Sequence, residues 1–256
     1  MRILILGDVV GKPGREHLRN KLFKFRKDNN IDFCIANGEN SSTANGISPT
    51  SLKDLYNCGV DGVTTGNHCF RKTRDLDAIY NGDIPVVRPA NFPDSMPGKG
   101  YTVVETPTCN IGIVNVMGRI YMNPIDSPFE AVDKAIEAVK NEADIIIVDF
   151  HAEATSEKLA MLCHLDGKVT ALVGTHTHVQ TADERVTEKG TAYITDLGMT
   201  GPVDSILGVK KEIIYNRFEN YGSDRFENAD GPCSINGVII ETDNSGRAIS
   251  IQRVME

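Results

Sequence analysis

The sequence lacks several patterns that would assign it to a specialised class of protein. It has no stretch approaching the roughly 20 consecutive apolar residues that a membrane-spanning helix needs. The apolar run near its N-terminus, from Ile3 to Leu6, is too short for the hydrophobic region of a signal peptide and is soon followed by an acid, Asp8. It also contains no internal repeat and no low-complexity tract. These absences predict a cytoplasmic protein with no membrane partner.

Paired cysteines and an excess of positive charge are missing as well. The six cysteines are widely spaced without a C-x-x-C motif, which predicts neither a zinc knuckle nor a redox pair, so we interpret them as reduced cytosolic thiols. The formal net charge is −8, with 27 Lys and Arg against 35 Asp and Glu. Because nucleic-acid binding draws its affinity from Lys and Arg on phosphates, an extended nucleic-acid surface is not expected. Any selectivity for phosphate must come from a local positive site.

The chain alternates short β-branched runs with longer amphipathic stretches, and its length suits one α/β domain over residues 1–256. Seven runs predict buried strands: Ile3–Leu6, Phe33–Ala36, Gly62–Thr65, Ile111–Val116, Ile145–Phe150, Ala171–Gly174 and Ala192–Thr195. Four stretches predict helices: Gly14–Lys27, Thr50–Tyr56, Pro128–Asn141 and Ser156–Leu165. This βαβαβ order predicts a parallel or mixed sheet.

Two further segments have their own patterns. Residues 81–101 are rich in proline and glycine, which predicts a long connection or a small cap. Near the C-terminus, the turn signal Asp243–Gly246 separates two apolar runs at residues 235–242 and 247–254, which predicts an antiparallel hairpin.

Polar side chains of metal-ligand type follow most of the predicted strands. Four of the six histidines belong to this group, and the other two fall on predicted helices. The group consists of Asp8, Glu39, Asn40, Asn67, His68, His151, His176 and His178. One histidine beside a strand is usually a satisfied core or rim residue, but so many ligand-type residues together are hard to explain that way. Because α/β proteins bind ligands at the carboxyl ends of their strands, we expect this group at one edge of one sheet.

The residue types and spacing indicate a pair of metal ions. His176 and His178 stand two residues apart, and on an extended strand both rings would point to the same side. The single carboxylate of Glu39 can bridge two cations about 3.5–4 Å apart. A glycine lies just before each block of these residues except His151, as Gly7, Gly38, Gly66 and Gly174, and we expect it to let the backbone turn sharply. Carboxylate, amide and imidazole together suit iron, manganese or zinc.

The ordered blocks Asp8, Gly38-Glu39, Gly66-Asn67-His68, His151 and Gly174-Thr-His176-Thr-His178 resemble the motifs of the calcineurin-like metallophosphoesterases. Two positions depart from the usual pattern of that superfamily, because Val10 stands where a histidine is usual and Glu39 where an aspartate is usual. Those departures, together with Gly-Glu-Asn at 38–40 and the segment Asp196–Pro202, resemble the YmdB-like branch of bacterial proteins.

The resemblance implies a four-layer αββα sandwich with mixed sheets. It also implies a phosphodiesterase that acts on small phosphate esters, 2′,3′-cyclic nucleotides above all, with two iron or manganese ions that hold a bridging hydroxide as the nucleophile. One ion would be held by Asp8, Glu39, Asn40 and His178, and the second by Glu39, Asn67, His151 and His176. Asn40 would replace the histidine missing at Val10, and His68 would act as general acid.

The sequence leaves alternatives open. A phosphomonoesterase or a protein phosphatase would use the same ligands, and a regulatory module could keep the metals without catalysis. His68 favours an enzyme, since a purely structural metal site needs no extra histidine. Five other charged residues could contact the substrate or be merely solvated or supporting: Lys12, Arg15, Arg71, Lys72 and Glu153. Asp196 could line the site, and the protein could form a homo-oligomer.

Overall fold

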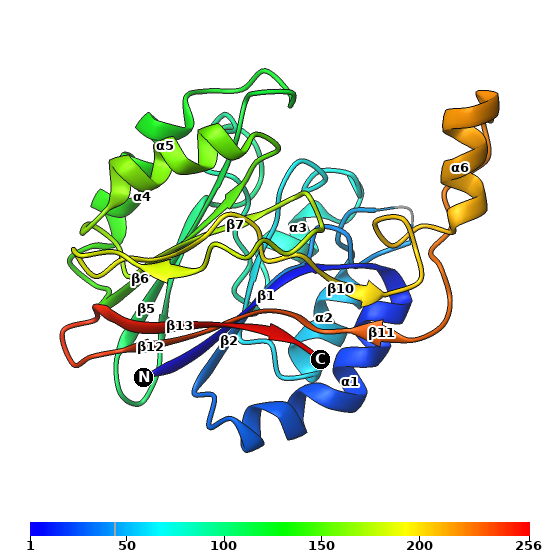
Figure 1. Ribbon diagram of the computed structural model, residues 1–256. Helices are drawn as coiled ribbons and strands as arrows, with labels where there is room; N and C mark the ends of the chain where they lie inside the picture. The colour runs from blue at the N-terminus through cyan, green and yellow to red at the C-terminus, as the bar shows by residue number, and fades with distance from the viewer. Residues whose placement is uncertain (44) are drawn as a thin grey trace.

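Two β-sheets form the centre of the molecule (Figure 1). The computed structural model describes residues 1–43 and 45–256. The first sheet contains β1 (Arg2–Val9), β2 (Phe33–Asn37), β3 (Gly62–Thr64), β10 (Met199–Pro202), β11 (Cys233–Ser234), β12 (Asn236–Thr242) and β13 (Ala248–Met255). The second contains β4 (Tyr101–Glu105), β5 (Asn110–Met117), β6 (Ile145–His151), β7 (Ala171–Thr175), β8 (Arg185–Val186) and β9 (Ala192–Ile194). The described helices are α1 (Gly11–Asp28), α2 (Pro49–Asn57), α3 (Leu76–Tyr80), α4 (Pro128–Val139), α5 (Thr155–Leu165) and α6 (Lys211–Asn220).

Both sheets are mixed, with parallel strands at their centres. The first follows the order β11-β10-β1-β12-β13, and β2 pairs in parallel with both β1 and β3. The second follows the order β4-β5-β6-β7-β9-β8, in which only the outer pairs β4-β5 and β8-β9 are antiparallel. All the carboxyl ends of the parallel central strands in one sheet therefore meet at one edge.

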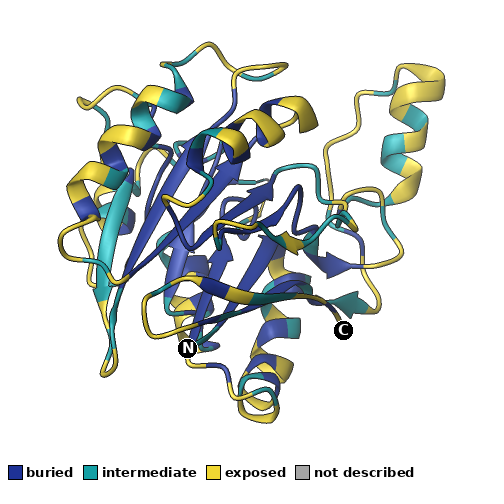
Figure 2. Cartoon of the chain, turned by 60° about the vertical axis from the view of Figure 1, so that its left-hand side comes forward, coloured by how far each residue is buried: buried dark blue, intermediate teal, exposed yellow. Residues whose placement is uncertain are grey.

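The alternation of side chains along the strands builds the layers. In β1, Ile3 and Ile5 pack between the two sheets, while Leu4 and Leu6 face the opposite way, into the cluster that includes α1 and α2. A third cluster packs α4 and α5 on the outer face of the second sheet. Figure 2 shows the resulting pattern, with buried strands between helices whose outward faces are exposed. The expected four-layer αββα arrangement is confirmed.

Every strand and helix predicted from periodicity is present, to within a few residues at the ends. The C-terminal hairpin is also confirmed, as β12 and β13. The start of α2 has a local cause: the Ser48 hydroxyl accepts the backbone N–H of Ser51 at 3.1 Å, and the Ser51 hydroxyl accepts that of Ser48 at 2.9 Å. Short elements such as β10 and β11 escaped prediction because two to four residues carry too little periodicity.

Two segments differ from the regular alternation of strands and helices. Residues 81–100 connect α3 to β4 without a helix of their own, and the buried guanidinium of Arg88 donates to the carbonyls of Pro89 and Pro97 at 2.8 and 3.2 Å. Helix α6 projects away from the rest of the molecule and has no buried residue (Figure 1). Because the two sheets share one apolar cluster, we propose that residues 1–256 form one domain.

No helix in the described parts of the chain is both long enough and apolar enough to cross a membrane.

Candidate metal centre

The structure brings all eight ligand-type residues singled out above to one place, but not to one sheet. Asp8 is in β1, Glu39 and Asn40 follow β2, and Asn67 and His68 follow β3 in the first sheet. His151 ends β6, and His176 and His178 follow β7 in the second sheet. The expectation of a single sheet edge was wrong, because face-to-face packing places the carboxyl ends of both sets of parallel strands against each other. The site lies between the sheets.

A first group of side chains surrounds the Asn40 amide. Its Nδ2 lies 3.2 Å from Asp8 Oδ1, 3.2 Å from His178 Nε2 and 3.4 Å from Glu39 Oε1. Asp8 is fully buried, and its Oδ1 is 3.7 Å from His178 Nε2. Two carboxylates, an imidazole and an amide, which offers an oxygen when its plane is turned, make a donor set for one transition metal.

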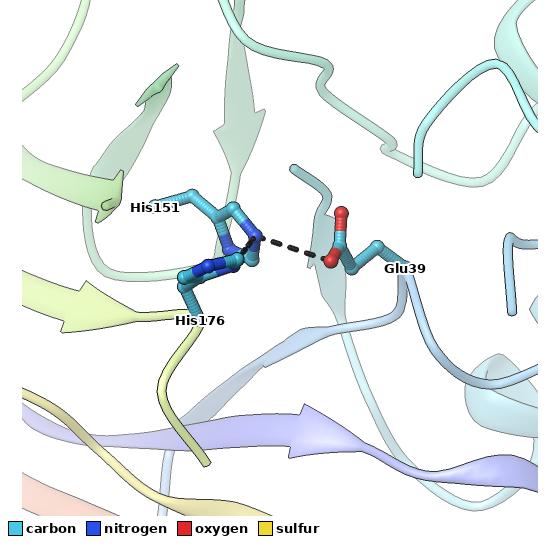
Figure 3. Close-up of side chains that lie close together, drawn as sticks. All are labelled: Glu39, His151 and His176. Atoms are coloured by element: carbon cyan, nitrogen blue, oxygen red, sulfur yellow. Dashed lines mark hydrogen bonds and ion pairs between the residues drawn. The ribbon is translucent and has the colours of Figure 1, made fainter. Parts of the chain in front are cut away.

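A second group surrounds the imidazole of His151, which is fully buried (Figure 3). His151 Nε2 lies 3.1 Å from Glu39 Oε1, 3.1 Å from His176 Nδ1 and 2.9 Å from Asn67 Oδ1. The ligand atoms of Glu39, His151 and His176 lie within 4.8 Å of one another, as the donors of one metal ion do. Two ring nitrogens and a carboxylate oxygen that face each other could hold a cation among them.

Electrostatics also favour a cation at this point. Burial would lower the pKa of His151, but the nearby Glu39 carboxylate outweighs burial and raises this pKa to about 9. Burial and the neighbouring His151 together lower the pKa of His176 to about 4. The pair therefore carries one positive charge near neutral pH in the metal-free state.

Glu39 lies between the two groups. Its side chain is 1% exposed, and Oε1 contacts Asn40 of the first group and His151 of the second. Burial alone would raise the pKa of Glu39, but the interactions with His151 and His68 outweigh it and hold this pKa well below its usual range. Glu39 is thus ionised and placed to serve both groups.

His68 borders the site without joining either group. Its backbone N–H donates to Glu39 Oε2 at 2.8 Å, and its Nδ1 lies 3.2 Å from Glu39 Oε1 in a direction unsuited to a hydrogen bond. The side chain keeps 24% of its surface exposed, whereas that of His151 is fully buried. A partly open imidazole beside the site can exchange protons with a bound molecule.

A buried polar network supports the far side of the His151 ring. His151 Nδ1 lies 2.9 Å from the Thr175 hydroxyl, which donates to Asp149 Oδ1 at 2.7 Å. Asp149 also accepts hydrogen bonds from Asn37 and Thr64, and burial raises its pKa to about 6. This network fixes the plane of the imidazole and keeps Nε2 toward Glu39.

The two histidines after β7 adopt an unexpected conformation. An extended strand was expected there, but the strand ends at Thr175, and His176 and His178 have φ angles of 102° and 64°. Positive φ is strained for residues other than glycine. The bend sends the His176 ring toward His151 in the second group and the His178 ring toward Asp8 in the first.

Glycine has a different role at the site from the one expected. Gly7, Gly38, Gly66 and Gly174 do not have positive φ, so sharp turns do not explain them. They allow close packing instead. A Cβ on Gly66 would overlap both the His151 ring and Glu39 Oε2.

We therefore expect Gly66→Ala to push His151 and Glu39 apart and to weaken Mn²⁺ binding by about 10–100-fold, the range seen when the support of metal ligands is lost. Isothermal titration calorimetry on metal-stripped protein measures this effect. Gly82→Ala is the control, since a Cβ there meets only the Ala78 carbonyl at 3.3 Å. Equal affinity in both variants would show that the backbone at residue 66 has room to move.

The other charged residues proposed as substrate contacts or supporting residues have different partners in the structure. Glu153 Oε2 lies 3.1 Å from His176 Nε2, where it can orient that ring. The Arg15 guanidinium is occupied by Asp54 at 3.0 Å and by the Ser41 carbonyl. Lys72 Nζ donates to the Thr43 carbonyl at 2.8 Å. Lys12 pairs with Glu16 on the exposed face of α1, 3.5 Å apart.

Sequence reasoning missed several residues that act around the site. Thr175 and Asp149 belong to strands that looked purely structural, although a carboxylate inside an apolar strand is itself an unusual signal. The Leu207 carbonyl, which lies 3.2 Å from His178 Nδ1, has no signal in the sequence because any residue has a carbonyl. Lys158, which also gave no signal, forms a buried ion pair nearby with Asp196, a residue that the sequence had suggested could line the site.

Comparisons with known proteins identify the family of the chain. The family model described as YmdB-like protein matches residues 4–254. The chain is 44% identical to a Bacillus subtilis protein named 2′,3′-cyclic-nucleotide 2′-phosphodiesterase, over 100% of this chain and 97% of that protein. A solved structure of a hypothetical protein from Thermus thermophilus superposes with a TM-score of 0.92 at 39% identity, covering 100% of this chain and 99% of the other. A Mycoplasma pneumoniae structure described as a novel phosphatase gives a TM-score of 0.93 at 36% identity, covering 100% and 93%.

Proposed function

This chain belongs to the YmdB-like family, and on that basis we propose that it is a metal-dependent phosphodiesterase that hydrolyses 2′,3′-cyclic nucleotides. The observation that carries the proposal is the position of Glu39, between two groups of metal-ligand side chains that share it. The names of the Bacillus subtilis relative and of the Mycoplasma pneumoniae phosphatase support a phosphoesterase. The two-sided arrangement around Glu39 supports a pair of metal ions.

The donor sets fit two ions. Asp8, Asn40, His178 and Glu39 would hold one, and Glu39, Asn67, His151 and His176 the other. The mixture of oxygen and imidazole donors, without a thiolate, supports iron or manganese. When bound, such ions lower the pKa of a coordinated water molecule, stabilise the charge of the transferring phosphoryl group and orient the substrate. With two ions held by these residues the pocket would be positive within an acidic protein, which would let it hold an anion.

The chain's own residues position the proposed metal ions and donate the proton to the leaving group. Glu39 and Asp8 are buried carboxylates that position both centres, and the network behind His151 keeps its Nε2 turned inward. We assign the proton donor to His68, because it is the one histidine among the four at the site that stands in neither ligand group. Its partly exposed ring can give a proton to the departing ribose oxygen, which is a poor leaving group as an alkoxide.

A substrate panel tests the proposal. We expect kcat/KM for 2′,3′-cyclic AMP to exceed that for 3′-AMP by at least about tenfold, which corresponds to ~1.4 kcal/mol of transition-state stabilisation. The product should be the 3′-phosphate, since cleavage at the 2′ oxygen leaves the phosphate on the 3′ oxygen. Protein loaded with Mn²⁺ should be assayed alongside metal-stripped protein and a phosphopeptide.

Each other outcome of the panel selects another function. A preference for 3′-AMP would indicate a phosphomonoesterase, and a preference for the phosphopeptide would indicate a protein phosphatase. Bound metal without hydrolysis of any ester would indicate a regulatory module. We further propose a cytoplasmic location, which is supported by six cysteines that all lie in the described residues as free thiols.

A further inference from the structure

The strained segment after β7 must be held in place by its surroundings. His176 and His178 keep positive φ angles although neither is glycine, and this backbone conformation is strained for such residues. Left alone, this segment would relax toward an extended conformation and the two rings would no longer reach separate groups. Whatever restrains its backbone therefore decides whether the two donor sets can coexist.

Three consecutive points of this backbone are bound by ionised side chains. The Thr175 carbonyl accepts from Lys158 Nζ at 2.9 Å, and the His176 N–H donates to Asp8 Oδ2 at 3.1 Å. The Thr177 N–H, between the two histidines, donates to Asp196 Oδ2 at 3.1 Å. Asp8 is a proposed ligand, whereas neither Lys158 nor Asp196 forms a hydrogen bond or an ion pair with the side chain of any proposed ligand.

Lys158 and Asp196 are also bound to each other in a dry environment. Nζ and Oδ2 are 2.8 Å apart, and the side chains are 1% and 0% exposed. Asp196 Oδ1 accepts the Gly198 N–H at 2.9 Å, so both carboxylate oxygens are engaged. Buried ion pairs of this kind rarely add net stability compared with apolar residues of similar size, because removing two charges from water is costly. The pair therefore calls for a reason other than stability.

The place of Lys158 on its helix strengthens this point. The buried residues Lys158, Met161, Leu162 and Leu165 follow the spacing of the apolar face of α5, so the lysine occupies a position that normally holds an apolar side chain. Gly174 makes space for it, since a Cβ at that position would come within 3.0 Å of Lys158 Cδ. The Lys158 side chain thus lies in the core, and the absence of a side chain at Gly174 lets it reach the end of β7.

We propose that Lys158 and Asp196 are a positioning pair that sets the backbone of residues 175–178, so that His176 and His178 serve different metal ions. The pair acts through the Thr175 carbonyl and the Thr177 N–H. The inference rests on the proposed function in one respect, namely that the two histidines bind metal. It goes beyond that function by assigning the geometry of both ligands to residues that touch neither ion.

The decisive comparison is between Lys158→Met and the double variant Lys158→Met/Asp196→Asn. The single variant leaves a buried carboxylate without its partner, so we expect a lower urea midpoint and Mn²⁺ binding weakened by about 10–100-fold. The double variant removes both charges, so the urea midpoint should recover toward that of the wild type. Its Mn²⁺ affinity should stay about 10–100-fold low, since nothing restores the two ionic hydrogen bonds to the backbone.

Two further variants separate positioning from loss of the fold. Thr177→Ala keeps the backbone N–H that Asp196 binds and should bind Mn²⁺ like the wild type. Lys158→Arg keeps a positive donor and should retain more affinity than Lys158→Met. Calorimetric titration of metal-stripped protein with Mn²⁺ measures the affinities, and hydrogen exchange of the Thr177 amide in the same metal-free protein should quicken in the double variant.

The outcomes distinguish this inference from the function on which it rests. Recovery of both stability and Mn²⁺ affinity in the double variant would overturn the positioning role and leave the pair merely structural. A loss of affinity in Thr177→Ala equal to that in the double variant would also overturn it. A wild-type protein that binds no Mn²⁺ would refute the proposed metal centre itself. Hydrolysis without any preference for cyclic esters would change the substrate and leave the positioning role intact.

Discussion

Replacing Glu39 by alanine is expected to remove both metal ions at once and to lower kcat/KM for 2′,3′-cyclic AMP by at least about 10²–10³-fold, the loss typical for one group that stabilises transition-state charge. The reason is its position. Its Oε1 lies 3.4 Å from Asn40 Nδ2 in the first group and 3.1 Å from His151 Nε2 in the second, so this one carboxylate contacts both groups. Elemental analysis of the purified variant, with kinetics at saturating Mn²⁺, measures both effects.

A matched carboxylate provides the control for Glu39. Glu184 is partly shielded and pairs with Arg253 at 2.7 Å, away from the metal groups, so Glu184→Gln should keep both metals and nearly full activity. If Glu39→Ala retained two metals and the wild-type rate, the bridging role would be wrong. Loss of only one metal would mean that Glu39 belongs to a single group and that the other is complete without it.

Replacing His68 by alanine should leave the metal content near normal while activity falls in a substrate-dependent way. A general acid contributes about 10²–10⁴-fold, and this benefit shrinks when the leaving group is already stable as an anion. We therefore expect a loss in that range on 2′,3′-cyclic AMP, whose leaving group is an alkoxide. The loss on a nitrophenyl ester should be much smaller. Both substrates are to be assayed at saturating Mn²⁺.

The His68 test also has clear alternatives. His164→Ala is the control, because His164 pairs with Asp133 at 2.8 Å on α5 and α4, outside the site. Equal losses on both esters with metals retained would show that His68 stabilises phosphoryl charge instead of donating a proton. Loss of a metal ion would make His68 a ligand, since its Nδ1 is 3.2 Å from the proposed bridge, Glu39.

The elements and the candidate residues could be predicted from the sequence because both depend on local patterns. The β-branched run from Ile3 to Leu6 predicts a strand through the alternation of its own side chains, whatever the rest of the chain does. A residue that directly follows such a strand, such as Asp8 or His151, must then lie at the carboxyl end of a sheet. For this reason the sequence predicts all eight candidates without any knowledge of the contacts between them.

Only the tertiary structure shows how the eight candidate residues are divided between the two ligand groups. Glu39 and His151 come from different sheets, and only the face-to-face packing of the sheets brings their atoms to 3.1 Å. Strand periodicity predicted the wrong conformation for His176 and His178, because contacts from distant segments outweigh the local preference against positive φ. Lys158 lies 17 residues from Thr175 in the chain, and Asp196 lies 19 residues from Thr177. Lys158 is buried only because α5 packs on the second sheet. Local preference is a property of neighbouring residues, whereas the distance between two side chains depends on the path of the whole chain between them.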